Sequence, residues 1–258
     1  MEIIRWIPSP NIMAGTTLRS GGVSNGALSS LNMALNVHDD EQKVIENRQR
    51  LALWLNTDFD HMVSPTQTHS THLYHVQAAD GGRGMKSLQD AIDDTDALYT
   101  REKNLYLLTY HADCIPVLLY EEKQQLIASI HAGWKGNVHE IIKKTITYLI
   151  ENENCKAQSF YAYIGPSLSF EHFEARQDII DYVQAMSFDT TPYYRVDSPG
   201  IYHLDAKGLA KAQLLNCGIA AERITVDPHC TKADEKHFFS YRRDHNCGRH
   251  VSFIALLK

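Results

Sequence analysis

Apolar residues recur at helical spacing in four segments of the chain, which therefore predict amphipathic helices. The four segments are residues 40–56, 137–151, 177–186 and 205–217. Asn137 and Glu140 have the Asn-x-x-Glu spacing of a capping box, which places the start of the second helix. Gly218 directly follows the last segment and is typical of a helix end.

Short apolar runs between these helices predict strands. The runs are residues 105–110, 115–120, 125–130, 159–165 and 250–256. Because helices and strands are interleaved without strict βαβ alternation, the predicted fold class is α/β (α+β), a layered sandwich with a mixed β-sheet flanked by helices. No repeat and no Pro/Gly-rich linker divides the chain, so residues 1–258 are predicted to form a single domain.

One pair of predicted strands places a thiol near an imidazole. In "HADCIPVLLYEEKQQLIASIHAGWKG" (111–136), a turn at residues 121–124 would leave Cys114 and His131 equidistant from its centre. Residues that oppose each other in an antiparallel pair have Cβ atoms about 4.5 to 5.5 Å apart. The two side chains are therefore predicted to meet, where they can bind one ion or exchange one proton.

A histidine-rich segment offers further ligands. "SPTQTHSTHLYH" (64–75) contains His69, His72 and His75, and in an extended strand only His69 and His75 share a face. Two His and one Cys suit zinc with an open fourth position, and the same set can hold copper. No His-x-His pair, the pattern from which multicopper centres are built, occurs in the chain.

Composition limits which binding partners and which cellular compartment we expect. A formal net charge of −6 gives no general attraction to nucleic acid or to an anionic membrane. Arg5 and two prolines interrupt the apolar N-terminal stretch, so it lacks the core of a signal peptide, and no run has the length of a membrane span. We therefore expect a cytoplasmic protein with five reduced cysteines, either a monomer or a homodimer.

Motifs along nearly the whole chain resemble those of the bacterial laccase-domain family, whose members have been labelled polyphenol oxidases and are described as zinc-dependent purine nucleoside phosphorylases with adenosine deaminase activity. The motifs are "RSGGVS" (19–24), "ENRQRLA" (46–52), "TQTH" (66–69), "DDTDALYT" (93–100), "HADCIPVLLY" (111–120), "HAGWKG" (131–136), "IGPSLS" (164–169), "CT" (230–231) and "FFSYRRD" (238–244) with Gly248 and Arg249. The resemblance implies a sandwich similar to cysteine-hydrolase-like folds. It also implies a catalytic metal set at His69, Cys114 and His131. The family often has Gly after the first ligand, where this chain has Ser70.

The resemblance further implies the reaction. Adenosine, inosine and methylthioadenosine would be cleaved with phosphate to the free base and (methylthio)ribose 1-phosphate, and adenosine would be deaminated at the same zinc site. Deamination needs a carboxylate that carries protons, for which Asp113 is the catalytic candidate beside Asp96. Either carboxylate would equally serve by hydrogen-bonding a ligand imidazole.

Phosphate requires cationic and backbone donors. Arg19, Ser20 and Ser24 lie in a glycine-containing turn suited to an anion, although the same pattern is typical of a plain hairpin turn. Arg48 and Arg242 are further substrate-binding candidates, and Arg243 is as typical of a structural role. For the purine, Trp134, Phe239 and Tyr241 are candidates for stacking.

Three other functions remain compatible with the sequence. A metal-free pair of Cys114 and His131 would act as a hydrolase or amidase in peptidoglycan precursor editing, a role with which the family has been connected. A copper-dependent polyphenol oxidase would consume oxygen with phenols and need no phosphate. A binding protein without chemistry would tolerate replacement of Cys114.

Overall fold

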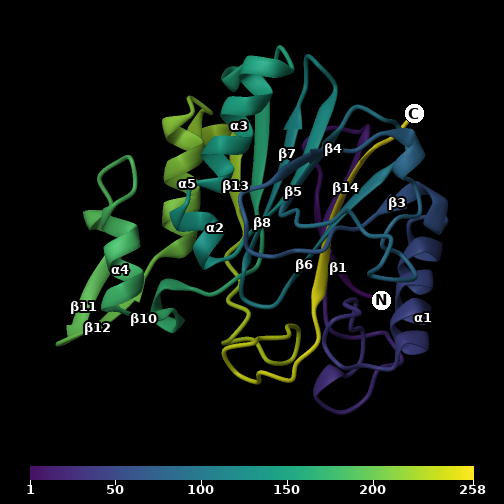
Figure 1. The fold of residues 1–258 in the computed structure, drawn as a ribbon, viewed down its shortest axis with the longest axis horizontal. Helices are drawn as coiled ribbons and strands as arrows, with labels where there is room; N and C mark the ends of the chain where they lie inside the picture. Colours follow the sequence, from purple (N-terminus) through teal and green to yellow (C-terminus); the bar gives the residue numbers. More distant parts are fainter.

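The computed structural model describes residues 1–258, whose strands form two large mixed sheets and one small sheet (Figure 1). The five-stranded sheet contains, in spatial order, β1 (Ile3–Trp6), β2 (Ile12–Thr17), β14 (His250–Leu256), β6 (Tyr106–His111) and β3 (Met62–Val63). The six-stranded sheet contains β13 (Ile224–Val226), β9 (Phe160–Ile164), β7 (Ile115–Glu121), β8 (Leu126–Ala132), β5 (Ala97–Thr100) and β4 (Leu73–His75). The small sheet contains β10 (Glu174–Arg176), β12 (Ile201–Leu204) and β11 (Tyr194–Ser198).

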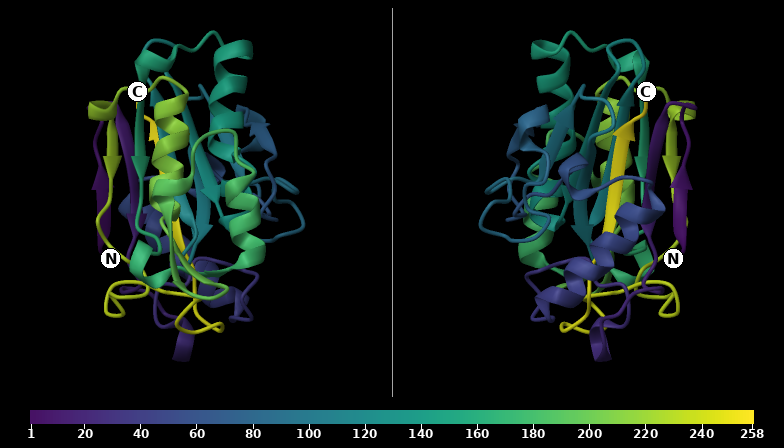
Figure 2. Two further views of the ribbon diagram at one scale, coloured as in Figure 1. Left: turned by 90° about the vertical axis from the view of Figure 1, so that its left-hand side faces the viewer. Right: turned by 90° about the vertical axis from the view of Figure 1, so that its right-hand side faces the viewer.

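Helices cover the outer faces of both large sheets. The α-helices are α1 (Glu41–Trp54), α2 (Trp134–Val138), α3 (Ile141–Asn152), α4 (Gln177–Gln184) and α5 (Ala206–Asn216). Short 3-10 helices occupy Gly26–Leu28, Phe59–His61, Ala78–Asp80, Ala157–Ser159, Phe170–His172, Thr191–Tyr193 and Ala221–Arg223. Helix α1 lies on one side of the molecule and α5 on the other, as the two views of Figure 2 show. No helix combines the length and the apolar character that crossing a membrane requires.

Three apolar clusters hold these layers together. Between the sheets, Leu107 and Ile254 pack with Leu118 and Ile127. The larger cluster joins the outer face of the six-stranded sheet to α2, α3 and α5, and a third joins the five-stranded sheet to α1. The result is a four-layer sandwich, which confirms the predicted fold class, although the strands are divided between two large sheets.

The hairpin that carries the thiol and the imidazole has a different register from the predicted one. Glu121 pairs with Leu126 and Pro116 pairs with His131, so the turn occupies residues 122–125. The predicted opposition of Cys114 and His131 is therefore wrong. Cys114 instead lies in the bend directly before β7, close to the carboxyl end of β8.

The predicted helix 137–151 is divided into α2 and α3. Glu140 separates them with a left-handed φ of 60°, and no side-chain cap precedes α3, so the predicted capping box is wrong. The amide of Asn137 is buried and donates instead to Ala206 O at 3.0 Å. The other three predicted helices are confirmed to within two residues at each end.

Candidate metal centre

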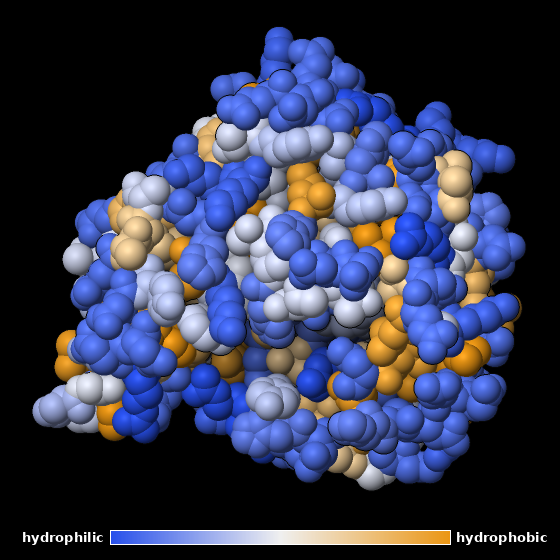
Figure 3. Space-filling model, in the orientation of Figure 1, coloured by the Kyte–Doolittle hydropathy of each residue, from blue (hydrophilic) through white to orange (hydrophobic).

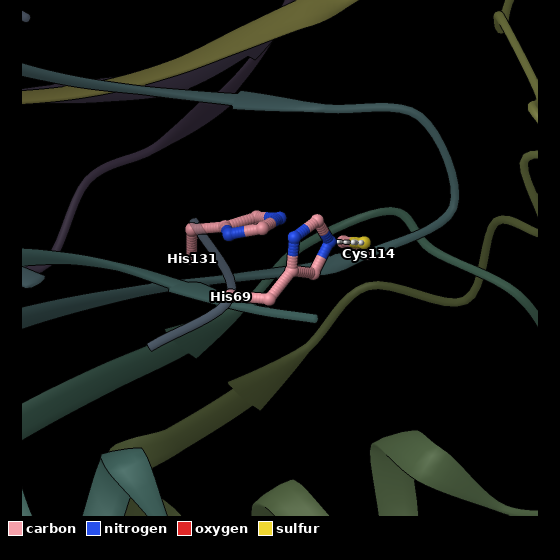
Figure 4. Close-up of side chains that lie close together, drawn as sticks. All are labelled: His69, Cys114 and His131. Atoms are coloured by element: carbon pink, nitrogen blue, oxygen red, sulfur yellow. Dashed lines mark hydrogen bonds between the residues drawn. The ribbon is translucent and has the colours of Figure 1, made fainter. Parts of the chain in front are cut away.

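Three side chains from separate segments converge on one point (Figure 4). His69 lies in the loop before β4, Cys114 precedes β7, and His131 belongs to β8. Their ligand atoms all lie within 4.8 Å of one another, and Cys114 Sγ is 3.8 Å from His69 Nε2. These are the three residues predicted as the metal set, and one sulfur with two imidazole nitrogens is a donor set that fits zinc.

Only one histidine of the 64–75 segment joins this group. Strand β4 begins at Leu73, so the predicted continuous strand through the three histidines is not formed. His69 has a left-handed φ of 63°, His72 Nδ1 pairs with Asp94 at 2.9 Å, and the ring of His75 stacks on Tyr99. The backbone turn at His69 therefore directs this histidine into the ligand group, while His72 and His75 bind elsewhere.

Asp96 organises two sides of the group at once. Its Oδ1 accepts a hydrogen bond from His131 Nδ1 at 2.7 Å, which leaves His131 Nε2 for the ion. Its Oδ2 accepts from the backbone N and the hydroxyl of Ser70 at 2.7 and 2.9 Å, and from Thr68 N at 3.1 Å. Asp96 thus orients one ligand directly and the loop of His69 through its neighbours, as carboxylates behind ligating histidines commonly do.

The charges of the group stabilise one another. Burial opposes ionisation of Asp96, but the hydrogen bond and charge of His131 prevail and lower the pKa of Asp96 to about 2. Burial likewise opposes the charged form of His131, yet Cys114 and Asp96 raise the pKa of His131 to about 9. Although burial favours the thiol, His131 and His69 lower the pKa of Cys114 to about 6. When no metal is bound, these contacts favour the thiolate form of Cys114.

The glycine of "HAGW" is required by close packing. A Cβ at Gly133 would lie 2.2 Å from His69 Cδ2 and 2.9 Å from His69 Nε2, closer than real Cβ atoms approach other heavy atoms. The absence of a side chain at this position lets the imidazole of His69 reach Cys114 and His131.

Two cavities adjoin the group and share His69, Ala112, Cys114 and Tyr241. The larger, of about 320 Å³, also contains Arg48, Tyr110 and Arg249 in its lining. The smaller, of about 220 Å³, is mainly apolar and includes Trp134, Leu168 and Phe173. In Figure 3 the lower half of the face is hollowed, with hydrophobic residues exposed beside the hollow.

Asp113 lines the smaller cavity, but its carboxylate is bound to the chain. Oδ1 accepts from the hydroxyl of Thr231 at 2.6 Å, and Oδ2 accepts from Ser240 Oγ at 3.0 Å and Arg242 N at 2.6 Å. Asp113 therefore fixes two loops beside the metal group. Of the two candidate carboxylates, the one that hydrogen-bonds a ligand imidazole is Asp96.

The turn expected to cradle phosphate lies away from both cavities. Arg19, Ser20 and Ser24 are absent from either lining. The guanidinium of Arg19 donates to Ser29 O and Glu235 O, and Ser24 Oγ donates to Asp39 at 2.6 Å. In the structure these side chains hold loops together, and the assignment of this turn to phosphate stays a prediction.

The other arginines differ in their surroundings. Arg48 is fully buried and lines the larger cavity, and Arg242 lines the smaller one, where its Nη1 donates to Glu174 O. Arg243 donates to the carbonyls of Thr231, Lys232 and Phe238, which is a structural role. Arg249, to which the sequence motif assigned no role, also lines the larger cavity.

Of the stacking candidates, Trp134 and Tyr241 line cavities, whereas Phe239 is fully buried and lines neither. The chain holds a single group of three metal-ligating side chains.

Comparison with known proteins identifies the family of the chain. Residues 13–257 match the family model described as "Multi-copper polyphenol oxidoreductase laccase". The chain belongs to this laccase-like family. Curated relatives in the family include "Purine nucleoside phosphorylase YlmD" of Bacillus subtilis, 35% identical over 95% of this chain and 88% of its own length. The protein of the same name from Geobacillus stearothermophilus is 33% identical over 96% of this chain and 91% of its own length.

Solved structures of the laccase-like family share the fold. The crystal structure of YlmD from Geobacillus stearothermophilus has a TM-score of 0.97 and 32% identity, and the match covers 100% of this chain and 97% of that one. The Bacillus licheniformis hypothetical protein YfiH has a TM-score of 0.94 and 34% identity, covering 96% and 93% of the two chains. The predicted family resemblance is thus confirmed.

Proposed function

We propose that this chain, acting as one domain, is a purine nucleoside phosphorylase. It would cleave adenosine, inosine and methylthioadenosine with phosphate and would deaminate adenosine at the same zinc site. The observation that carries the proposal is the convergence of His69, Cys114 and His131 beside two cavities. The names of the curated relatives support it.

The donor set and the cavities suit this chemistry. Zinc held by His69, Cys114 and His131 would supply a Lewis acid next to the bound substrate. Asp96 keeps His131 Nδ1 protonated, so that Nε2 is available as a ligand. The smaller cavity offers an apolar wall and the indole of Trp134 for a flat purine.

Deamination needs a proton carrier within reach of the substrate. Asp113 is the one carboxylate that lines either cavity, and we assign it this role. Because its oxygens also hold the loops of Thr231 and Ser240, Asp113→Asn would weaken those contacts. The thermal unfolding temperature of the variant must therefore be measured together with inosine formation from adenosine.

Product analysis tests the proposal. Zinc-loaded protein is incubated with adenosine or inosine, with and without phosphate, and the products are separated by chromatography. Free base with ribose 1-phosphate in the presence of phosphate supports phosphorolysis, and inosine from adenosine supports deamination. His69→Ala should abolish both, with His72→Ala as the matched control because His72 lies outside the ligand group. Absence of both products would overturn the proposal.

One observation favours a second candidate, a metal-free amidase. Cys114, His131 and Asp96 have the roles of nucleophile, base and orienting carboxylate, and the thiol pKa is lowered to about 6. Full activity on an amide substrate after chelator treatment would support this candidate. Activity that is lost with zinc and restored by zinc would eliminate it.

A further inference from the structure

The larger cavity contains a buried positive charge without a counter-ion. Arg48 is 1% exposed, and its guanidinium donates only to backbone carbonyls. Nε donates to Met33 O at 2.8 Å, and Nη1 donates to Gly84 O at 2.6 Å and to Met85 O at 3.0 Å. Removing a charge from water costs several kcal/mol unless an opposite charge compensates it, so a cation in this state is unusual.

Two polar atoms of residues in the cavity lining remain without a partner in the chain. Nη2 of Arg48 and the hydroxyl of Tyr110 are both buried, and neither has a hydrogen bond. The two residues adjoin, since the guanidinium carbon of Arg48 lies 5.0 Å from the centre of the Tyr110 ring. Buried polar atoms are nearly always hydrogen-bonded, so two unpartnered donors on adjoining residues of one cavity lining point to a ligand.

The rest of the lining fits an anion. Arg249 adds a second positive charge, and its Nη1 donates to Cys247 O and Gly248 O, not to a carboxylate. No Asp or Glu lines this cavity. His69, Cys114 and His131 belong to the same lining, so an anion bound by these donors would lie beside the metal group.

We propose that Arg48 Nη2, the Tyr110 hydroxyl and Arg249 form the subsite for the oxygens of inorganic phosphate. Guanidinium groups suit this ligand because their N–H donors match the geometry of phosphate oxygens. The proposal rests on the proposed phosphorolysis and assigns its phosphate to the larger cavity, in place of the turn at residues 19–24. The nucleoside then occupies the smaller cavity, on the other side of the metal group.

Tyr110→Phe is the decisive variant. It removes one hydroxyl that has no partner in the protein, so the thermal unfolding temperature should stay unchanged or rise. Hydrogen bonds to a charged group contribute about 1.5–3 kcal/mol, so affinity for inorganic phosphate should fall about tenfold or more. Arg249→Gln should weaken phosphate binding in the same direction. Tyr106→Phe, on the same strand, is the matched control because Tyr106 lines neither cavity.

Calorimetric titration of zinc-loaded protein with inorganic phosphate measures the site without turnover. Phosphate binding by the wild type that both variants weaken and Tyr106→Phe retains supports the subsite. Equal affinity in Tyr110→Phe and the wild type, or no binding to the wild type, overturns it.

Kinetic assays separate this inference from the proposed function. Ribose 1-phosphate formation with an unchanged KM for phosphate in Tyr110→Phe would refute the subsite and leave phosphorolysis standing. Phosphate binding that depends on Tyr110 and Arg249, without any ribose 1-phosphate formation, would refute phosphorolysis and leave the subsite standing.

Discussion

Replacement of Gly133 by alanine should eliminate one metal ligand without unfolding the protein. The new Cβ would lie 2.2 Å from His69 Cδ2. Carbon atoms in contact are usually about 3.5 Å apart or more, so the imidazole must move by about 1 Å or more to relieve the clash. Metal–ligand distances tolerate only about 0.2 Å. His69 would therefore leave the ligand group.

The magnitude follows from the number of ligands. Structural zinc sites bind with about 10–16 kcal/mol over four ligands, so one ligand accounts for roughly 3 kcal/mol, or about 100-fold in affinity. The fold should be retained, because φ −62° and ψ 167° at residue 133 are accessible to alanine and His69 is exposed and can turn outward. Competition with a chromophoric chelator measures the zinc affinity, and thermal unfolding of the metal-free protein measures the stability.

Gly136→Ala serves as the control in the same motif, since its nearest contact would be Ser70 O at 3.2 Å, which a shift of a few tenths of an ångström relieves. It should bind zinc nearly as well as the wild type. Wild-type zinc affinity in Gly133→Ala would refute the assignment of His69 as a ligand. A large loss of stability without metal would show instead that Gly133 serves the fold.

Three further predictions follow from the site's charges and contacts. Asp96→Asn should destabilise the metal-free protein by about 1–3 kcal/mol in urea unfolding, because one amide oxygen cannot accept from both His131 and the backbone N–H groups near Ser70. Alkylation of metal-free Cys114 by iodoacetamide should rise with pH around a midpoint of about 6, since His131 stabilises the thiolate, and zinc should block it. Arg19→Ala should lower the unfolding temperature, because Arg19 donates to Ser29 O and Glu235 O, and should leave phosphate affinity unchanged.

Each of these predictions has its own control. Asp94→Asn is the control for Asp96→Asn, because it removes the same charge two residues away. If it lowered the free energy of unfolding as much as Asp96→Asn does, the reasoning would be contradicted. Because the pKa of Asp96 is lowered in the folded protein, its carboxylate stabilises the fold above about pH 4, and this contribution to the free energy of unfolding is lost as the pH falls towards about 2. The Asp96→Asn variant should not show this decrease in stability with falling pH. Cys217, whose pKa burial raises to about 11, should stay unreactive at pH 7, and a Cys114 midpoint near 9 would refute the thiolate. Weaker phosphate binding in Arg19→Ala would restore the turn at residues 19–24 as the phosphate site.

Local pattern determined much of the scaffold. The sequence predicted α1, α4 and α5 from their apolar spacing, and β6 to β9 and β14 from their apolar runs, because each of these elements buries one continuous face or run. The strands β1 to β3, β5 and β10 to β13 escaped prediction, and β4 was predicted only as part of a longer strand. Most of them are only two to four residues long, and several pair with distant segments, as in β2 with β14 and β13 with β9.

For the metal set, the sequence predicted which residues converge but not the strand register that positions them. Its three residues were predicted from a hairpin, a histidine-rich segment and the family motifs. The register was wrong because hairpin register depends on turn geometry, and Gln125 takes a left-handed φ of 49° at the end of a turn that starts one residue later than predicted. The bend at Cys114 and the turn at His69 still bring the ligand atoms together.

Only the tertiary structure decided which residues serve these ligands and the cavities beside them. Asp96 lies 35 positions from His131 in the chain, and the two pair because β5 and β8 are neighbours in one sheet. Arg48 reaches the larger cavity from α1, where it meets Tyr110 of β6. Residue type alone cannot distinguish a structural arginine from one that faces a ligand, because the distinction rests on which of its donors the folded chain leaves without a partner.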